Sequence, residues 1–119
     1  MNKKTKHIVY ILAVLVLITP IVGHYLAKTS EPYLFATKFI NDNDVILKEF
    51  GDIQSQSLSF FGYSVKYTGP NGEASFNILL IGITGLSGDI HLDLVKEVGA
   101  WQVTKANLIK IDGSVINIK

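Results

Sequence analysis

The sequence has no cysteine and no arginine, and its one methionine is the first residue. The missing cysteine excludes a disulfide framework, thiolate metal ligands, a cysteine nucleophile and a CxxC redox pair. Without cysteine or an internal methionine, a soft-ligand copper site is excluded as well. Arginine is the side chain that grips phosphate and guanine with two hydrogen bonds at once. Its absence, together with a formal net charge of only +1, argues against nucleic-acid binding.

The few charges are unevenly distributed along the chain. Residues 1–7 carry Lys3, Lys4 and Lys6 and no acidic residue. From Lys28 onward, eight lysines stand against ten acidic residues, which gives that part a net charge of −2. The chain therefore has a basic N-terminal tail and a mildly acidic remainder.

Residues 8–27 form an uncharged apolar run, IVYILAVLVLITPIVGHYLA. Twenty helical residues are ~30 Å long, which matches the hydrocarbon core of a bilayer. Pro20 is tolerated in a membrane helix, and the rings of His24 and Tyr25 suit the depth of the lipid headgroups. The run predicts a transmembrane anchor, whose bilayer contacts we assign to Ile8, Tyr10, Leu12, Leu15, Leu17, Pro20 and Tyr25.

The lysines around the run predict its orientation. By the positive-inside rule, the basic tail stays in the cytoplasm of a bacterium or in a mitochondrial matrix, and the domain lies on the far side of the inner membrane. The alternative is a cleaved signal peptide. The best cleavage site, after Gly23, has Ile21 at the −3 place, and the run is longer than an ordinary signal sequence. We therefore favour an uncleaved anchor.

The rest of the chain divides into a short polar joint, residues 28–32, and one soluble domain, residues 33–119. Removing the tail and anchor leaves roughly 90 residues, which is enough for a modest core without disulfides or metals. Apolar residues then recur at helical spacing from Tyr33 to Phe50, with Ser30 placed to cap the helix and Gly51 to end it. Within this helix the polar run Asn41–Asp44 predicts either an exposed turn or a break, with Asp44 capping a second helix.

After Gly51 the apolar period changes from 3.6 to 2, which predicts a sheet. We expect a bulge near Gly62, and an Asp112-Gly113 turn of two residues. The apolar centre of the second strand, residues 78–81, predicts a strand covered on both faces. The predicted strands span residues 58–67, 74–84, 89–95, 101–111 and 114–118.

The resulting fold class is α+β: an N-terminal transmembrane helix, then one helix packed on a four- to five-stranded antiparallel meander sheet. The spaced glycines after the second strand precede another strand rather than a helix, so they indicate bends and close packing instead of a dinucleotide site. We expect structural roles for Gly51, Gly82, Gly85, Gly88 and Trp101.

Candidate chemistry is sparse. Asp89, His91 and Asp93 share one strand face, where two carboxylates around an imidazole could bind a divalent metal or act as an acid–base pair. No second histidine lies nearby, so an ordinary solvated face is the better interpretation. The serines have no GxSxG or SxxK context. We therefore expect no enzyme activity, no metal and no cofactor.

The order of features resembles the cytochrome c oxidase assembly factor 1 family of small single-pass membrane proteins. The resemblance rests on the helix end Val45–Ile53, on Gly85–Asp89, and on Gly99–Ile111 followed by Gly113, with a Gly-x-Trp at its start. It spans nearly the whole chain, but its motifs are glycines, apolar alternation and one tryptophan. The resemblance implies a membrane-tethered, non-enzymatic assembly domain.

Two functions follow as expectations. The first is a membrane-anchored interaction domain that assists the assembly or stability of a membrane protein complex, such as a respiratory oxidase. Its partners are the lipid bilayer and another membrane protein. The alternative is a membrane-tethered domain of cystatin-like type that binds a small ligand in an apolar pocket. The side chains expected to line that pocket are Phe60, Phe61, Tyr63 and Tyr67.

Overall fold

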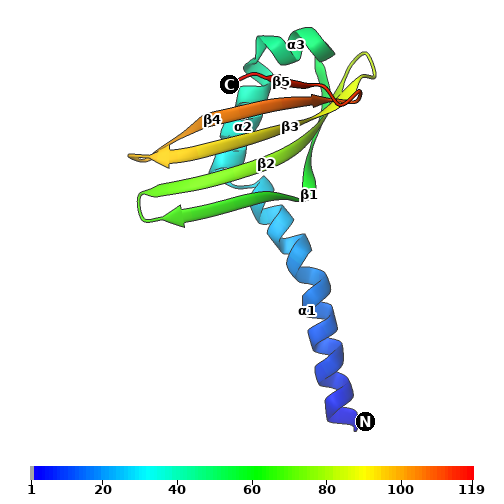
Figure 1. The fold of residues 1–119 in the computed structure, drawn as a ribbon. Coiled ribbons are helices and arrows are strands. Elements are labelled where there is room, and N and C mark those ends of the chain that lie inside the picture. The colour runs from blue at the N-terminus through cyan, green and yellow to red at the C-terminus, as the bar shows by residue number, and fades with distance from the viewer. Residues whose placement is uncertain (1) are drawn as a thin grey trace.

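A computed structural model describes residues 2–119 as one long helix that leads into an α+β domain (Figure 1). The five strands form a single antiparallel sheet in the order β1-β2-β3-β4-β5, so every strand pairs with its neighbour in the chain. The predicted α+β meander is therefore confirmed. The elements are α1 Lys3–Lys28, α2 Glu31–Asp42, α3 Asp44–Phe50, β1 Ile53–Thr68, β2 Asn71–Gly82, β3 Ser87–Glu97, β4 Ala100–Lys110 and β5 Val115–Asn117.

Helix α1 projects away from the domain over most of its length (Figure 1). Its N-terminus is capped by Asn2, whose side chain accepts a hydrogen bond from the backbone N–H of Thr5. The helix continues through Pro20. It is long and apolar enough to cross a membrane, and its most apolar part is not buried in the protein.

The helical region after α1 breaks at Asn43 instead of continuing through a polar turn. Asn43 caps α3, because its side-chain oxygen accepts from the backbone N–H groups of Val45 and Ile46 at 3.0 and 3.1 Å. The predicted cap Asp44 is wrong by one residue: Asp44 is the first residue of the helix. Ser30 occupies the cap position of α2 without a capping hydrogen bond, and its hydroxyl donates to Ala27 O at 2.6 Å.

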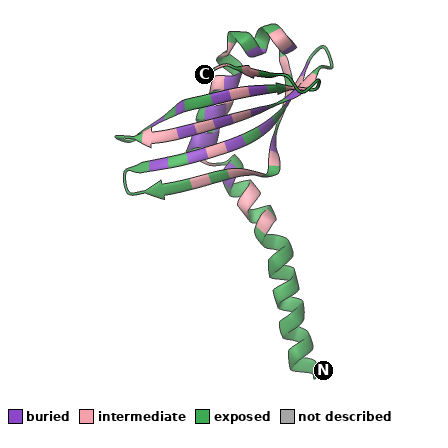
Figure 2. Ribbon diagram, in the orientation of Figure 1, coloured by how far each residue is buried: buried purple, intermediate pink, exposed green. Residues whose placement is uncertain are grey.

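The core lies between α2 and one face of the sheet (Figure 2). Side chains on alternate positions of the three central strands point toward α2, as the period of two predicts. This interior is filled by side chains of at most 1% exposure: Ala36, Ile40, Ile46, Phe76, Ile78, Leu80, Ile90, Leu92, Leu94, Ala106 and Leu108.

The opposite face of the sheet is open to solvent. Two residues in the middle of β2 point toward this open face: Asn77 is exposed, and the side chain of Leu79 is 37% exposed to solvent. The expectation that residues 78–81 are covered on both faces is therefore wrong. No helix among residues 2–119 packs on that face, so the sheet has two-layer rather than three-layer packing.

Strand β1 changes register in its middle. Leu58 pairs with Ile78 and Tyr63 pairs with Phe76, so four residues of β1 stand opposite the single residue Asn77. This confirms the bulge predicted near Gly62. Bulges bend a strand and increase its twist, and Figure 1 shows β1 turning sharply on the side of the domain from which α1 leaves.

The last hairpin has a three-residue turn, so the predicted two-residue turn at Asp112-Gly113 is wrong. The backbone N–H of Lys110 donates to Ser114 O at 2.9 Å, which leaves residues 111–113 between the paired ends. Gly113 takes the left-handed conformation with φ of +88°, as a three-residue hairpin with a bulge requires.

Two glycines of β2 and β3, Gly82 and Gly88, allow the backbone and ring of Phe50 to approach closely. A methyl group on Gly82 would overlap the carbonyl of Phe50, and one on Gly88 would lie 2.9 Å from the Phe50 ring. Phe50 is 3% exposed and closes this end of the core. Gly85 differs, because it has open space around it but a φ of +86°.

We predict that Gly82→Ala lowers the free energy of unfolding by about 2 kcal/mol, because the added methyl is forced against the backbone of Phe50. Gly85→Ala is the matched control. It places the same methyl in open space and should cost about 1 kcal/mol, from its left-handed φ alone. Urea unfolding of the full chain in detergent micelles, followed by far-UV circular dichroism, measures both. Equal losses would contradict a packing role for Gly82.

The β3–β4 turn contains a strained residue. Val98 has φ of +52° although its side chain is branched at Cβ, and it is 96% exposed, so no packing compensates. Val98→Asn should raise the free energy of unfolding by about 0.5–1 kcal/mol, because asparagine tolerates this conformation. Val98→Thr keeps the branch while adding polarity and should change nothing. A matching gain in the threonine variant, seen in the melting temperature, would attribute the effect to polarity instead.

Candidate functional site

The end of α1 is built into the domain through His24. Its Nε2 lies 3.0 Å from the backbone oxygen of Leu58 in β1, a geometry in which the imidazole N–H donates to the carbonyl. The same ring stacks on Phe60, with ring centroids 5.1 Å apart. The sequence predicts that His24 lies at the depth of the lipid headgroups; within the protein, its ring contacts the bulged segment of β1.

Two small residues of α1 extend this contact. Gly23 faces the hydroxyl of Tyr63 so closely that any larger side chain would meet it. Ala27, one turn further on, is 5% exposed and belongs to the hydrophobic core. Only two residues, Thr29 and Ser30, separate α1 from α2, and the backbone N–H groups of both donate to carbonyls of the last turn of α1. The apolar helix therefore meets the domain through packed side chains and not through a flexible linker.

An apolar groove of about 370 Å³ lies beside this junction. It is open to solvent and runs between the last two turns of α1 and the second half of β1. Of the four side chains expected to line a pocket enclosed by the helix and the sheet, Tyr63 and Tyr67 line this open groove instead, whereas Phe60 and Phe61 do not. The lining consists of Gly23, Leu26, Ala27, Ser30, Tyr63, Val65 and Tyr67.

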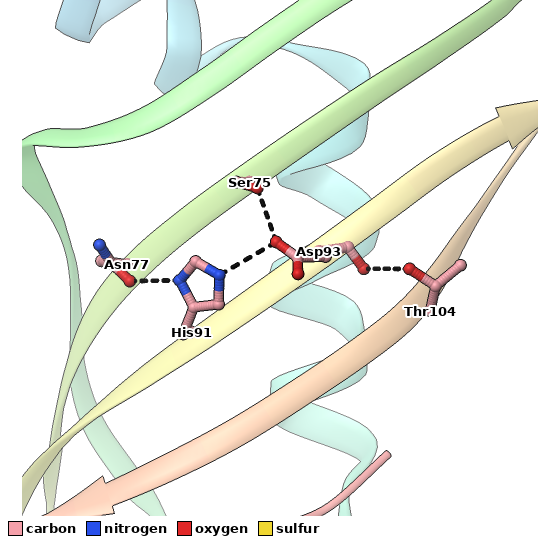
Figure 3. A network of polar contacts seen from close by, with 5 residues as sticks. All are labelled: Ser75, Asn77, His91, Asp93 and Thr104. Atoms are coloured by element: carbon pink, nitrogen blue, oxygen red, sulfur yellow. Dashed lines mark hydrogen bonds and ion pairs between the residues drawn. The ribbon is translucent and has the colours of Figure 1, made fainter.

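A polar network crosses the open face of the sheet (Figure 3). The His91 ring lies between two oxygens, with Nδ1 2.6 Å from Asn77 Oδ1 and Nε2 3.0 Å from Asp93 Oδ1. The Ser75 hydroxyl donates to the same Asp93 oxygen at 2.6 Å. The Thr104 hydroxyl donates to the backbone oxygen of Asp93 at 3.2 Å.

The order of contacts in this network does not fit nucleophilic catalysis. A serine nucleophile is activated by an adjacent base, most often an imidazole, but Ser75 donates to the Asp93 carboxylate and both ring nitrogens of His91 face other oxygens. Asp89 takes no part in the network. Among residues 2–119, no group of three His, Asp or Glu side chains is arranged to hold a metal ion.

A second apolar surface lies at the end of the domain away from α1, around the β2–β3 and β4–β5 turns (Figure 1). Leu86 and Ile111 line one groove of about 340 Å³ together with Phe50. Ile109 and Val115 pair across the adjacent strands. We call this surface the hairpin patch; its members are between 39% and 76% exposed and comprise Ile83, Leu86, Ile109, Ile111 and Val115.

An ion pair borders the hairpin patch. The Lys110 ammonium lies 2.8 Å from a carboxylate oxygen of Glu49, and hydrogen bonding to Glu49 raises the pKa of Lys110 above its ordinary value. In the turn itself, hydrogen bonds from the Ser114 hydroxyl and backbone N–H lower the pKa of Asp112. The apolar patch thus has a charged rim, which is the usual composition of a protein-binding surface.

No family model, no curated protein and no solved structure matches this chain. The site is therefore defined by its geometry alone.

Sequence reasoning did not find the junction between α1 and β1. One signal was available, because His24 is the single strongly polar side chain near the end of the apolar run and such groups normally have a partner. Its partner is a backbone carbonyl 34 positions away, which no local pattern encodes. The sequence likewise places the residues of the hairpin patch in separate strands and turns, and no local pattern indicates that they form one surface.

We predict that the hydrogen bond and the ring stacking of His24 contribute separately to stability. His24→Phe keeps a ring against Phe60 but leaves the Leu58 carbonyl unpaired, at a cost of about 1 kcal/mol. His24→Ala also loses the ring pair and should cost about 1 kcal/mol more. Tyr25→Ala, on the exposed side of the same turn, is the control and should change little. Urea unfolding in micelles measures all three. Equal stability of the His24 and Tyr25 variants would refute this role for the junction.

Proposed function

We propose that this protein is a membrane-anchored, non-enzymatic interaction domain that assists the assembly or stability of a membrane protein complex. The observation that carries the proposal is the packed junction between the apolar helix and the domain. His24 is hydrogen-bonded to the backbone of β1, Gly23 lies against Tyr63, and Ala27 is in the core. If α1 crosses the membrane, the domain is held at a fixed height and orientation above it.

A fixed orientation matters most to a protein that presents one surface to a membrane partner. An anchor with a loose linker restricts a domain to the bilayer surface, whereas a rigid one also reduces the orientational freedom that binding would otherwise cost. The hairpin patch is then displayed on the side of the domain away from the bilayer. Its exposed Ile83, Leu86 and Ile111, rimmed by the Glu49–Lys110 pair, suit the extramembrane part of a partner.

The membrane side follows from the lysines. Three lysines, Lys3, Lys4 and Lys6, precede the apolar run, and only Lys28 directly follows it. By the positive-inside rule, the N-terminus is proposed to stay on the cytoplasmic side of the inner membrane and the domain to lie on the opposite side. The resemblance to the oxidase assembly factor family makes a respiratory oxidase the first complex to examine.

A second candidate is a tethered domain that binds an apolar ligand. The observation in its favour is the groove beside the junction, about 370 Å³ in volume and lined mostly by carbon atoms of Leu26, Tyr63, Val65 and Tyr67. The groove is open, and the interior between α2 and the sheet is filled by side chains of at most 1% exposure. A ligand of this site would therefore be held at the surface, next to the bilayer.

The two candidates differ in what is lost when the gene is deleted. The interaction domain predicts that one membrane complex, measured by native electrophoresis and mass spectrometry, falls several-fold in abundance. The full chain should restore it, whereas the double variant Leu86→Ser/Ile111→Ser should not. The matched control is Leu34→Ser/Leu47→Ser, which changes two exposed leucines outside the patch and should restore it.

Unchanged abundance of every membrane complex after deletion would contradict the interaction domain. If a lipophilic compound were also released when the purified protein is denatured, the ligand-binding candidate would replace it. Equal restoration by the patch variant and the control would remove the hairpin patch from the proposal.

A further inference from the structure

The bulge of β1 carries two aromatic side chains that are exposed on the surface of the domain. Phe61 is 80% exposed, and Phe60 is 41% exposed although one face of its ring stacks on His24. The two phenyl rings meet edge to face, with centroids 4.8 Å apart. Large aromatic rings exposed side by side usually mark a binding surface.

The position of these rings along α1 indicates what covers them. Phe60 contacts His24, which lies within the uncharged run of residues 8–27 and four residues before Lys28. At a rise of ~1.5 Å per residue, His24 is about 6 Å closer to the bilayer centre than Lys28. If α1 spans the membrane, the bulge therefore lies at the depth where the headgroups meet the acyl chains, the level at which aromatic side chains are enriched.

The hydrogen bond between His24 and Leu58 supports this depth independently. A bulge leaves backbone groups of the strand without ladder partners. In water such a carbonyl needs no protein partner, but near hydrocarbon an unpaired carbonyl or imidazole is costly. Here the carbonyl of Leu58, the last residue of β1 in register with β2 before the bulge, and the His24 ring satisfy one another at 3.0 Å.

From these observations we infer that the β1 bulge is a second membrane contact, in which Phe60 and Phe61 enter the headgroup–acyl boundary beside α1. The inference rests on the membrane-spanning role proposed for α1 and deepens it. A single helix fixes the height of a domain but lets it rotate about the helix axis. A second contact at the side of the helix presses one edge of the domain onto the bilayer, and so selects which face points toward it.

The test uses the full chain reconstituted alone into phosphatidylcholine vesicles, with part of the lipid brominated near the top of the acyl chain. Phe61→Trp adds an indole at the bulge, and the exposure of Phe61 makes the substitution tolerable for folding. We expect the added emission to be quenched roughly twofold, as for an aromatic side chain at the interface. Ile111→Trp, on the hairpin patch and 76% exposed, is the matched control and should not be quenched. The unsubstituted protein gives the background from the buried Trp101.

The outcomes separate this inference from the proposed function. Alkaline carbonate extraction of the same vesicles reports whether α1 is integral. If the protein stays in the membrane but the Phe61→Trp emission is unquenched, the second contact is refuted while the anchor stands. If the protein is extracted, the anchor fails as well.

Discussion

The contact between the last turns of α1 and the bulge of β1 determines how this molecule is put together. Without it, an apolar helix and a small sheet domain would share only a covalent connection. With it, Ala27 completes the core, Tyr63 lies over Gly23, and His24 forms a hydrogen bond to the carbonyl of Leu58, where the bulge begins. The direction of α1 therefore fixes the orientation of the domain, and both functional proposals depend on this coupling.

The domain itself has two layers, a helical layer and a sheet. One helix covers one face of a five-stranded meander, and the other face stays in solvent. The open face carries the Ser75–His91–Asp93 network, in which the Ser75 hydroxyl donates to the Asp93 carboxylate and not to the His91 imidazole. The apolar surface lies elsewhere, at the two ends of the domain, where the β1 bulge and the hairpin patch are. This separation agrees with a protein that is positioned at one end and binds at the other.

Much of the fold was predictable because local patterns encode it. The alternation of Ile90, Leu92 and Leu94 identified the buried face of β3, and the phase change around Gly62 identified the bulge. The errors arose where a local pattern has more than one solution. Residues 78–81 are all apolar, which predicts a strand covered on both faces. Whether helices cover the second face of the sheet depends on how many helices the whole chain forms. In the last turn Gly113 lies where it was predicted, but Ile111 belongs to the turn and not to the strand. The Asp-Gly dipeptide alone does not specify the length of the turn.

The sequence by itself determined the apolar helix, the change from helical to strand period, and the absence of thiol chemistry, because each depends on residue type and spacing within a short stretch. Only the tertiary structure decided which polar group His24 would meet, that Phe50 would close against Gly82 and Gly88, and that Phe60 and Phe61 would stand beside the apolar helix. Those contacts join residues far apart in the chain. For the contacts of His24, Phe60 and Phe61 the physical cause is the bend of β1 at its bulge, and a bend of that kind is set by the packing of the whole sheet.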